Sequence, residues 1–379
     1  MIALGRALAA RGHDVTLETW RRWRGDVERE GMRFAPAPEY QVFPSGGPPL
    51  DFYGAAERAA RETLELVRDI EPEVVVADIL TLAPALAAEM RGVPRATLVP
   101  HVLPYGEDGF PVYSLGARYP RTAAGRLMWR ALRAPVARGE ERGRLELNAV
   151  RANLGLAPQE RTHGGMSEEL VLVSTLPELE YPRRSEDRVH VIGPLLWEPG
   201  AEEVALPAGD GPLVLVAPST AQDSEHRLLW AAVAGLRGTG VRVLATYNRR
   251  LPSRPLPLAR NVSVVEWVSY ARTMPSCDVV VCHAGHGTLV RALASGCAIV
   301  ACPAAGDMAE NAARVDWAGA GVRLPRRLLS PATLRWAVMR ALGEPAIRER
   351  ARAIAERSAA HDAAAVGAEL VEELAARHA

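Results

Sequence analysis

One short stretch of the chain combines the residue types and spacing of an anion-binding turn. Cys282-His283-Ala284-Gly285-His286-Gly287-Thr288 follows three valines and precedes a helical pattern. Glycines let backbone N–H groups approach a ligand closely, and a helix start adds the positive end of its dipole. His283 can donate a hydrogen bond to phosphate and Thr288 offers a hydroxyl. The stretch therefore predicts a diphosphate site, with a tight turn that serves only packing as the alternative.

The same stretch could belong to an NAD site. Gly285-x-Gly287-x-x-Val290 lacks the third glycine of that fingerprint, although Asp307 follows at the spacing of a ribose-binding carboxylate. Asp307 lies beyond Pro303 rather than at a strand end, and the motif follows the fourth strand of its domain. We therefore favour a diphosphate-linked ligand over NAD.

The cysteines superficially resemble a zinc site, because they form two C-x4-C pairs with His283 and His286 between them. They are Cys277, Cys282, Cys297 and Cys302. Each pair encloses a strand-like run, which separates its thiols by about 16 Å. Zinc–sulfur bonds measure only about 2.3 Å. We expect free, buried thiols in a reducing compartment and no metal.

The elements that must position these residues are short β-branched runs alternating with helical patterns. Strands are expected at Asp14–Thr19, Glu73–Asp78, Arg95–Val99, Glu169–Thr175, Arg188–Ile192, Leu213–Ala217, Val241–Ala245, Val262–Glu266, Asp278–Cys282 and Ala298–Ala301. Helices are expected at Gly54–Ile70, Leu82–Arg91, Ser224–Leu236, Gly287–Ser295, Met308–Ala318 and Pro331–Leu342. Such alternation is typical of parallel sheets covered on both faces.

This order predicts an α/β protein with two doubly wound, Rossmann-like domains facing across a cleft. Ligands should bind at the carboxyl ends of the strands. We expect an N-terminal domain at 1–196, a Gly- and Pro-rich linker at 197–212, a C-terminal domain at 213–343 and a helical segment at 344–379.

The beginning of the chain is unusual for such a domain. Residues 1–11 have a helical pattern that ends at Gly12, with no N-cap residue in front. A doubly wound domain normally opens with a central strand and a ligand-facing turn. We therefore expect the first strand of the N-terminal domain to be missing from this sequence.

Composition excludes several classes of mechanism and partner. All 45 basic residues are arginine, which rules out Schiff-base, PLP-linkage and P-loop lysine chemistry from this chain. The 45 acidic residues balance them, and no long run of like charge indicates nucleic-acid binding. We find no apolar run of about 20 residues and no signal peptide. We expect a cytoplasmic monomer or homodimer.

The second half resembles a known family over most of its length, the nucleotide-sugar-dependent glycosyltransferases of the GT-B fold. Within family 1 it is most similar to actinobacterial natural-product enzymes of the macrolide and enediyne type. The resemblance rests on Glu266-Trp267-Val268, Met274-Pro275-Ser276-Cys277-Asp278, His283 to Thr288, Ala292 to Gly296, Pro303, Asp307, Asn311-Ala312 and Gly319-Ala320-Gly321. In the first half it is looser, resting on Ala9 to Thr16, Val75 to Asp78 and Val191 to Pro194.

By position, the resemblance implies that Trp267 and Val268 line a nucleobase pocket. It implies that His283 and the backbone of Gly285, His286, Gly287 and Thr288 hold a diphosphate. The nucleotide sugar would be a co-substrate, and no cofactor is implied. Trp267 could instead be a packing aromatic.

The resemblance also implies roles for four further polar residues. Ser219 and Thr220 would cap the diphosphate from the other side, or could serve only as a helix N-cap. Asp307 and Asn311 would contact the transferred sugar or its phosphate.

Departures from the family pattern concern the donor. Ser269-Tyr270 replaces the usual Pro-Gln, Arg291 stands where many members have a ribose-binding Glu, and Met308 replaces a sugar-binding Gln. The loss of these hydroxyl partners favours a dTDP-linked deoxysugar over a UDP-hexose.

The resemblance implies inverting, metal-independent transfer with a histidine base oriented by an aspartate. Asp78 matches that aspartate, and a carboxylate of this kind fixes the imidazole tautomer. His13 is a helix length from the catalytic end, so we reject it as the base. The family pattern would place the histidine just before Met1.

Three explanations of the missing base stay open. The sequence begins downstream of the true start, which we favour, or the protein is an inactive or accessory homologue. Alternatively His101, after the strand Arg95–Val99, substitutes. If His101 is not the base, we interpret it as a loop or acceptor-pocket residue.

The acceptor side is the least determined. Pro100 to Arg144 is rich in aromatic residues, including Tyr105, Phe110 and Tyr113. With the Pro-rich loop Pro36–Leu50 it would line an apolar pocket for a small lipophilic acceptor. Besides a glycosyltransferase, we consider a non-enzymatic nucleotide-sugar-binding protein, a GT-B nucleotide-sugar epimerase and an NAD-dependent oxidoreductase.

Overall fold

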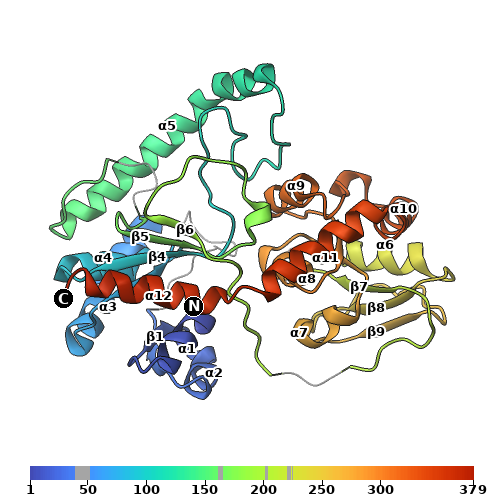
Figure 1. The fold of residues 1–379 in the computed structure, drawn as a ribbon, viewed down its shortest axis with the longest axis horizontal. Coiled ribbons are helices and arrows are strands. Elements are labelled where there is room, and N and C mark those ends of the chain that lie inside the picture. The colour runs from blue at the N-terminus through green and yellow to red at the C-terminus, as the bar shows by residue number, and fades with distance from the viewer. Residues whose placement is uncertain (39–51, 161–164, 201–203, 220–222, 224) are drawn as a thin grey trace.

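The structure is a computed structural model. It describes residues 1–38, 52–160, 165–200, 204–219, 223 and 225–379. Two α/β layers lie side by side in Figure 1, and the last helices of the chain run across both.

The second half contains a fully parallel sheet of six strands. They are β7 (Leu213–Ala217), β8 (Arg242–Thr246), β9 (Val262–Val265), β10 (Val279–Cys282), β11 (Ala298–Ala301) and β12 (Gly321–Arg323). The order is β12-β11-β10-β7-β8-β9, so β10 and β7 lie at the centre. Every residue of β7, β10 and β11 is buried, which explains their uniformly apolar sequences.

Helices cover both faces of this sheet. Residues of α6 (Arg227–Leu236) and α10 (Pro331–Gly343) form one apolar cluster with alternate strand residues such as Val214 and Val216. Residues of α8 (His286–Ala294), α9 (Met308–Ala318) and α11 (Pro345–Ala359) form the other, with residues such as Leu213 and Leu215. This is the doubly wound arrangement that the sequence predicted.

The first half contains two separate parallel sheets. One has the order β3-β4-β5-β6, with β3 (Val75–Asp78), β4 (Arg95–Val99), β5 (Leu170–Val173) and β6 (Val189–Val191). The other pairs β1 (Thr16–Thr19) with β2 (Arg33–Pro36). Among the described residues, no strand hydrogen-bonds to both sheets.

The same helices nevertheless cover both of these sheets. In α1 (Ile2–Ala10), Leu4 joins the apolar cluster of β4 and β5, while the neighbouring Gly5 contacts Met32 just before β2. On the other face, Thr63 of α3 (Phe52–Ile70) donates a 2.9 Å hydrogen bond to Glu18 of β1. That helix also packs on α4 (Leu82–Arg91), which covers β3. The two sheets therefore form one interrupted layer.

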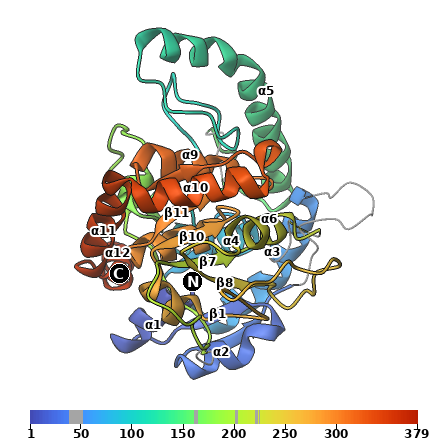
Figure 2. The ribbon, with the colours of Figure 1, turned by 90° about the vertical axis from the view of Figure 1, so that its right-hand side faces the viewer.

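The segment after residue 343 belongs to both halves. Helix α11 packs on α8 of the second half, and α12 (Ala363–Ala376) packs on α1 and β5 of the first. Figure 1 shows α11 and α12 crossing from one layer to the other, and Figure 2 shows them at one side of the molecule. The sequence indicated helices here but not this crossing.

Most expected elements lie within a few residues of their predicted bounds, and β4, β7, β11, α4 and α9 match their predictions residue for residue. Local patterns missed the short β2, β12 and α2 (Arg24–Arg29) and the long α5 (Ala123–Asn153). The three short elements carry too few apolar residues to show a period. Helix α5 contains Pro135, and none of its residues before Leu147 is buried, so its first 24 residues show no core-facing stripe.

Candidate active site

The predicted anion-binding turn lies where the central strand β10 meets α8. Ala284 adopts a left-handed backbone conformation with φ 60°, which turns the chain sharply after the strand. Its N–H lies 3.4 Å from the Cys282 sulfur. Gly285 is the N-cap of α8, and none of the described side chains caps this helix. The first N–H groups of α8 are therefore available to a ligand.

The two glycines keep the approach to this helix start open. A Cβ atom built on Gly285 or Gly287 meets no heavy atom of the described residues within 4 Å, and Gly287 is exposed. An anion can thus reach the backbone N–H groups without displacing a side chain. The helix dipole favours negative charge at the same place.

His283 is held by two partners beside this turn. The Ser219 N–H donates to its Nδ1 at 2.8 Å, and its Nε2 lies 3.5 Å from Asp223 Oδ2. Nδ1 is therefore the acceptor, and Nε2 carries the proton that faces Asp223. Burial opposes ionisation of Asp223, but hydrogen bonds from His283 and the backbone of Leu228 outweigh it and lower its pKa to about 2. Thr220 lies outside the described residues.

The aromatic side of the site is built around Trp267. Its ring stacks on Tyr270 with centroids 6.5 Å apart, and the Arg249 guanidinium lies 4.9 Å from its centroid. Burial raises the pKa of Tyr270 and the nearby side chain of Thr288 opposes that rise, so this stack lies beside the first turn of α8. Val268 is only 1% exposed and belongs to the core, so at most its backbone faces a ligand.

His286 points away from the anion-binding turn and crosses to the first half of the molecule. Its Nε2 lies 2.9 Å from the Thr175 hydroxyl, and the backbone of Pro100 lies near its ring. Burial and the nearby His101 lower the pKa of His286 to about 3, so it is neutral at physiological pH. The structure thus gives His286 a place at the contact between the two halves.

Asp307 and Asn311 lie together at the start of α9. The Asn311 amide donates to the Ala284 carbonyl at 3.0 Å and to Asp307 Oδ2 at 3.1 Å. Asn311 Oδ1 is buried and has no hydrogen-bond partner among the described residues. Burial and the nearby carboxylates of Asp307 and Glu310 raise the pKa of Tyr113. Tyr113 from the first half therefore faces Asp307 from the second.

Asp78 and His101 lie at the carboxyl ends of neighbouring parallel strands, β3 and β4. Asp78 Oδ1 accepts a 2.8 Å hydrogen bond from the Leu80 N–H. Burial raises the pKa of Asp78, and the hydrogen bond from Leu80, the nearby Met1 α-amino group and, least of the three, His101 oppose that rise. His101 Nδ1 lies 2.7 Å from the Val102 carbonyl, so it donates there and Nε2 is left as the basic nitrogen. The His101 ring lies 6.2 Å from that of Tyr113.

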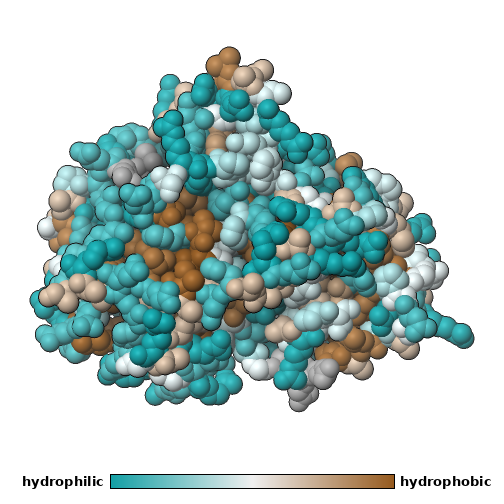
Figure 3. Space-filling view, in the orientation of Figure 1, coloured by the Kyte–Doolittle hydropathy of each residue, from teal (hydrophilic) through white to brown (hydrophobic). Residues whose placement is uncertain are grey.

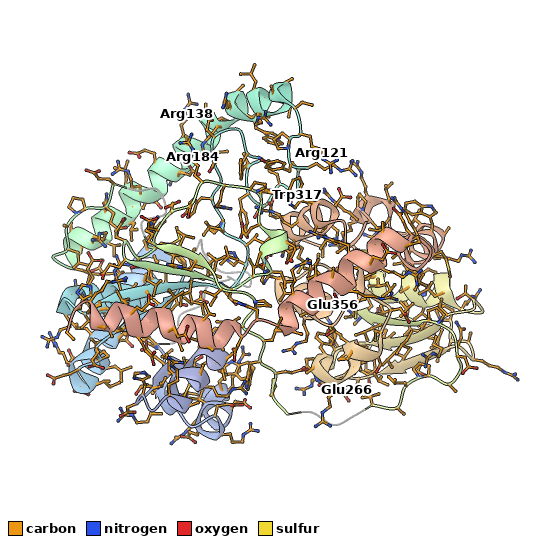
Figure 4. The ribbon with its side chains drawn as sticks, in the orientation of Figure 1. Arg121, Arg138, Arg184, Glu266, Trp317 and Glu356 are labelled. Carbon is orange, nitrogen blue, oxygen red and sulfur yellow. The ribbon has the colours of Figure 1, made fainter. Side chains whose placement is uncertain are left out.

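The other two acceptor candidates lie apart from Tyr113. The Tyr105 hydroxyl donates a 3.1 Å hydrogen bond to Glu186. Phe110 packs against Tyr119 and Tyr181, in an aromatic cluster that includes Trp317 of α9 (Figure 4). Of these three, Tyr113 lies near His101 and Asp307, and Phe110 packs on the two tyrosines that contact Trp317 of the second half.

All four cysteines are free and buried, as the sequence predicted. Burial raises the pKa of each thiol. No cluster of three potential metal ligands occurs in the described part of the chain.

Sequence reasoning missed four side chains that shape this site. They are Thr175, Asp223, Arg249 and Tyr270. An aspartate before an apolar run is an N-cap signal, so Asp223 could have been noticed. The contact of Thr175 with His286 joins residues 111 positions apart, and nothing in the local sequence indicates it.

Comparison with known proteins adds independent observations. Residues 241–376 match the family model described as erythromycin biosynthesis protein CIII-like, C-terminal domain. The 4'-demethylrebeccamycin synthase of Lentzea aerocolonigenes is 29% identical over 410 residues, which cover 99% of this chain and 96% of that protein.

Solved structures share the whole fold. The glycotransferase of kitacinnamycin superimposes with a TM-score of 0.76 at 23% identity, covering 98% of this chain and 94% of the other. The glycosyltransferase VinC in complex with dTDP superimposes with a TM-score of 0.71 at 19% identity, covering 100% and 96%. In the described part of the chain, no helix is long and apolar enough to cross a membrane.

Proposed function

We propose that this chain is a glycosyltransferase of the natural-product type, which it resembles in sequence and fold, and that it glycosylates a small lipophilic acceptor. The sugar would come from a nucleoside diphosphate, with inversion and without a metal ion. The supporting observation is the uncapped start of α8. Its N–H groups are open above Gly285 and Gly287, and Tyr270, which lies near Thr288 of the same turn, stacks on the Trp267 ring.

Each part of the donor would meet one part of this site. The nucleobase would stack on Trp267, from which it must displace the Arg249 guanidinium. The diphosphate would accept hydrogen bonds from the start of α8, where the helix dipole also stabilises the leaving group. His283 would donate a hydrogen bond to the diphosphate only if its Nε2–H turned away from Asp223. Asp307 and the free Asn311 Oδ1 would accept hydrogen bonds from sugar hydroxyls.

Arg291 and Met308 favour a dTDP-deoxysugar as the donor. Arg291 carries no hydrogen-bond acceptor for a ribose hydroxyl, and Met308 offers no amide to a sugar hydroxyl. VinC, which has the same fold, is solved with dTDP bound. Competition calorimetry tests this preference, and clearly tighter binding of UDP-glucose than of any dTDP-sugar would overturn it.

His101 is the described residue best placed to act as the base. Its Nε2 would take the proton of the acceptor hydroxyl, whose oxygen attacks the anomeric carbon as the bond to the diphosphate oxygen breaks. The positive imidazolium would be stabilised by Asp78. Tyr113 would lie beside the acceptor, because its ring is near both His101 and Asp307.

The test is turnover of a dTDP-sugar by His101→Gln. We expect a fall in kcat of at least 100-fold, in the range of lost general-base catalysis, with unchanged affinity for dTDP. His190→Gln, on strand β6, is the matched control and should retain activity. Wild-type turnover in His101→Gln would exclude this residue as the base.

A second candidate function is an inactive partner that binds nucleotide sugars. It is favoured by one observation, because no imidazole hydrogen-bonds Asp78 among the described residues. Tight dTDP binding by the wild-type protein, without any turnover across a panel of acceptors, would select this function over the enzyme.

A further inference from the structure

The first turns of α5 form the outermost part of the molecule. In Figures 1 and 2, α5 rises from the first half and bends, so that its beginning lies across the top. Pro135 lies inside the helix and accounts for such a bend, because proline removes a helical hydrogen bond. We call residues 122–138 the α5 tip.

The α5 tip exposes a continuous apolar stripe. Leu127, Met128 and Leu132 are 64%, 50% and 49% exposed. Ala124, Ala131 and Pro135 are also exposed and continue the same helical face at spacings of three and four residues. Brown side chains at the top of Figure 3 mark this end of the molecule. The stripe is about 18 Å long at 1.5 Å per residue.

The same region concentrates positive charge in a chain that is neutral overall. Residues 109–139 contain six arginines and no Asp or Glu. Three of the arginines pair with carboxylates outside this stretch, namely Arg118, Arg130 and Arg133. Arg121, Arg126 and Arg138 have no carboxylate partner among the described residues, and Figure 4 shows Arg121 and Arg138 on either side of the tip.

We propose that the α5 tip binds the surface of an anionic lipid membrane. An apolar helical stripe flanked by arginines is the pattern of a helix that lies in the membrane interface. Leucine and methionine side chains would enter the acyl boundary, while the long arginine side chains reach the phosphate groups. Lipid phosphates are the chemistry that complements the unpaired arginines.

Charge argues against a second copy of this chain as the occupant. Two α5 tips brought together would place six unpaired arginines at one interface, which costs free energy through like-charge repulsion. A membrane covers the stripe and neutralises the arginines at the same time. Its binding requires neither a nucleotide nor turnover, so this inference and the proposed function can fail separately.

Vesicle co-sedimentation tests the proposal. We expect wild-type protein to sediment with phosphatidylcholine vesicles that contain 30% phosphatidylglycerol, and not with pure phosphatidylcholine. Raising the salt to 0.5 M should release it. The variant Leu127→Glu/Met128→Glu should lower partitioning at least tenfold, and Arg121→Ala/Arg138→Ala should lower it about fivefold per arginine.

Matched controls keep the test decisive. Leu258→Glu changes an equally exposed leucine in the second half, at 62%, and should bind like the wild type. All variants alter exposed side chains, so their melting temperatures should stay at the wild-type value.

Three results would overturn the proposal. The first is failure of the wild type to sediment with anionic vesicles, and the second is equal sedimentation of the wild type and the tip variants. The third is a dimer without lipid affinity that Leu127→Glu/Met128→Glu converts to a monomer, which would make a second copy the occupant.

Discussion

At the scale of single residues, the Arg249 guanidinium and the nucleobase of our proposal would compete for one face of the Trp267 ring. Tyr270 stacks on one side of the ring and Arg249 lies over it at 4.9 Å. Arg249 has a left-handed backbone conformation with φ 63°, as does the preceding Asn248 with φ 51°. Asn248 is held by a hydrogen bond to the Pro218 carbonyl, so the turn after β8 fixes where Arg249 begins.

Replacement of Trp267 by Ala should lower the affinity for a nucleoside diphosphate by about tenfold to 100-fold. Stacking of a base on an aromatic side chain contributes about 1–3 kcal/mol. Titration calorimetry with dTDP measures the loss. Trp336→Ala removes an exposed tryptophan of α10 that also lies under an arginine, and it should bind dTDP like the wild type. Unchanged affinity in Trp267→Ala would place the base elsewhere.

At the scale of elements, α8 is a helix whose first turn is left open. It is nine residues long, has a glycine as its N-cap and contains a second glycine inside its first turn. Neither glycine has a positive φ, so backbone conformation does not require them. We infer that their value lies in the open space above the N–H groups.

Gly287→Ala separates binding from folding at this element. Alanine is more favourable than glycine within a helix by up to about 1 kcal/mol, so the melting temperature should stay or rise. The added methyl group would occupy the space of the diphosphate, and affinity for dTDP should fall at least tenfold. Gly139→Ala in α5 also meets open space and should leave the affinity unchanged. Tight dTDP binding by Gly287→Ala would argue against a diphosphate here.

At the scale of the whole molecule, the two halves are joined by buried polar and aromatic contacts. His286 reaches Thr175, and Arg314 of α9 donates a 3.0 Å hydrogen bond to the Leu179 carbonyl. The Arg314 guanidinium also lies 3.5 Å from the centroid of the Tyr181 ring. These contacts hold the carboxyl ends of both sheets against each other.

The His286 contact should make stability depend on pH. Its pKa is about 3 in the folded protein and about 6.5 when it is exposed. Between these values the unfolded chain binds a proton that the folded chain does not, so stability is lost as the pH falls from 6.5 towards 3. Urea unfolding at pH 7.5 and pH 5 measures this loss. It should be smaller in His286→Gln and unchanged in His190→Gln, and an equal loss in all three proteins would contradict the assignment.

The local sequence determined the elements of this protein and the stretch that binds the donor in our proposal. Buried strands such as β7 and β11 are continuous apolar runs bounded by polar or turn residues, so their bounds could be predicted exactly. The turn from His283 to Thr288 was recognisable because a strand end, two glycines and a helix start are adjacent in sequence. These features depend on neighbouring residues, which is why local patterns report them.

Tertiary structure alone decided how these elements meet. The sequence placed the backbone of His286 at the diphosphate and left the direction of its ring open; packing turns that ring to Thr175, and Arg249 covers Trp267. Helix α12 returns to cover α1 and β5, at least 190 residues along the chain from that strand. Such contacts join residues far apart in the chain, and each side chain settles where burial and hydrogen bonding are satisfied together. No local pattern carries that information.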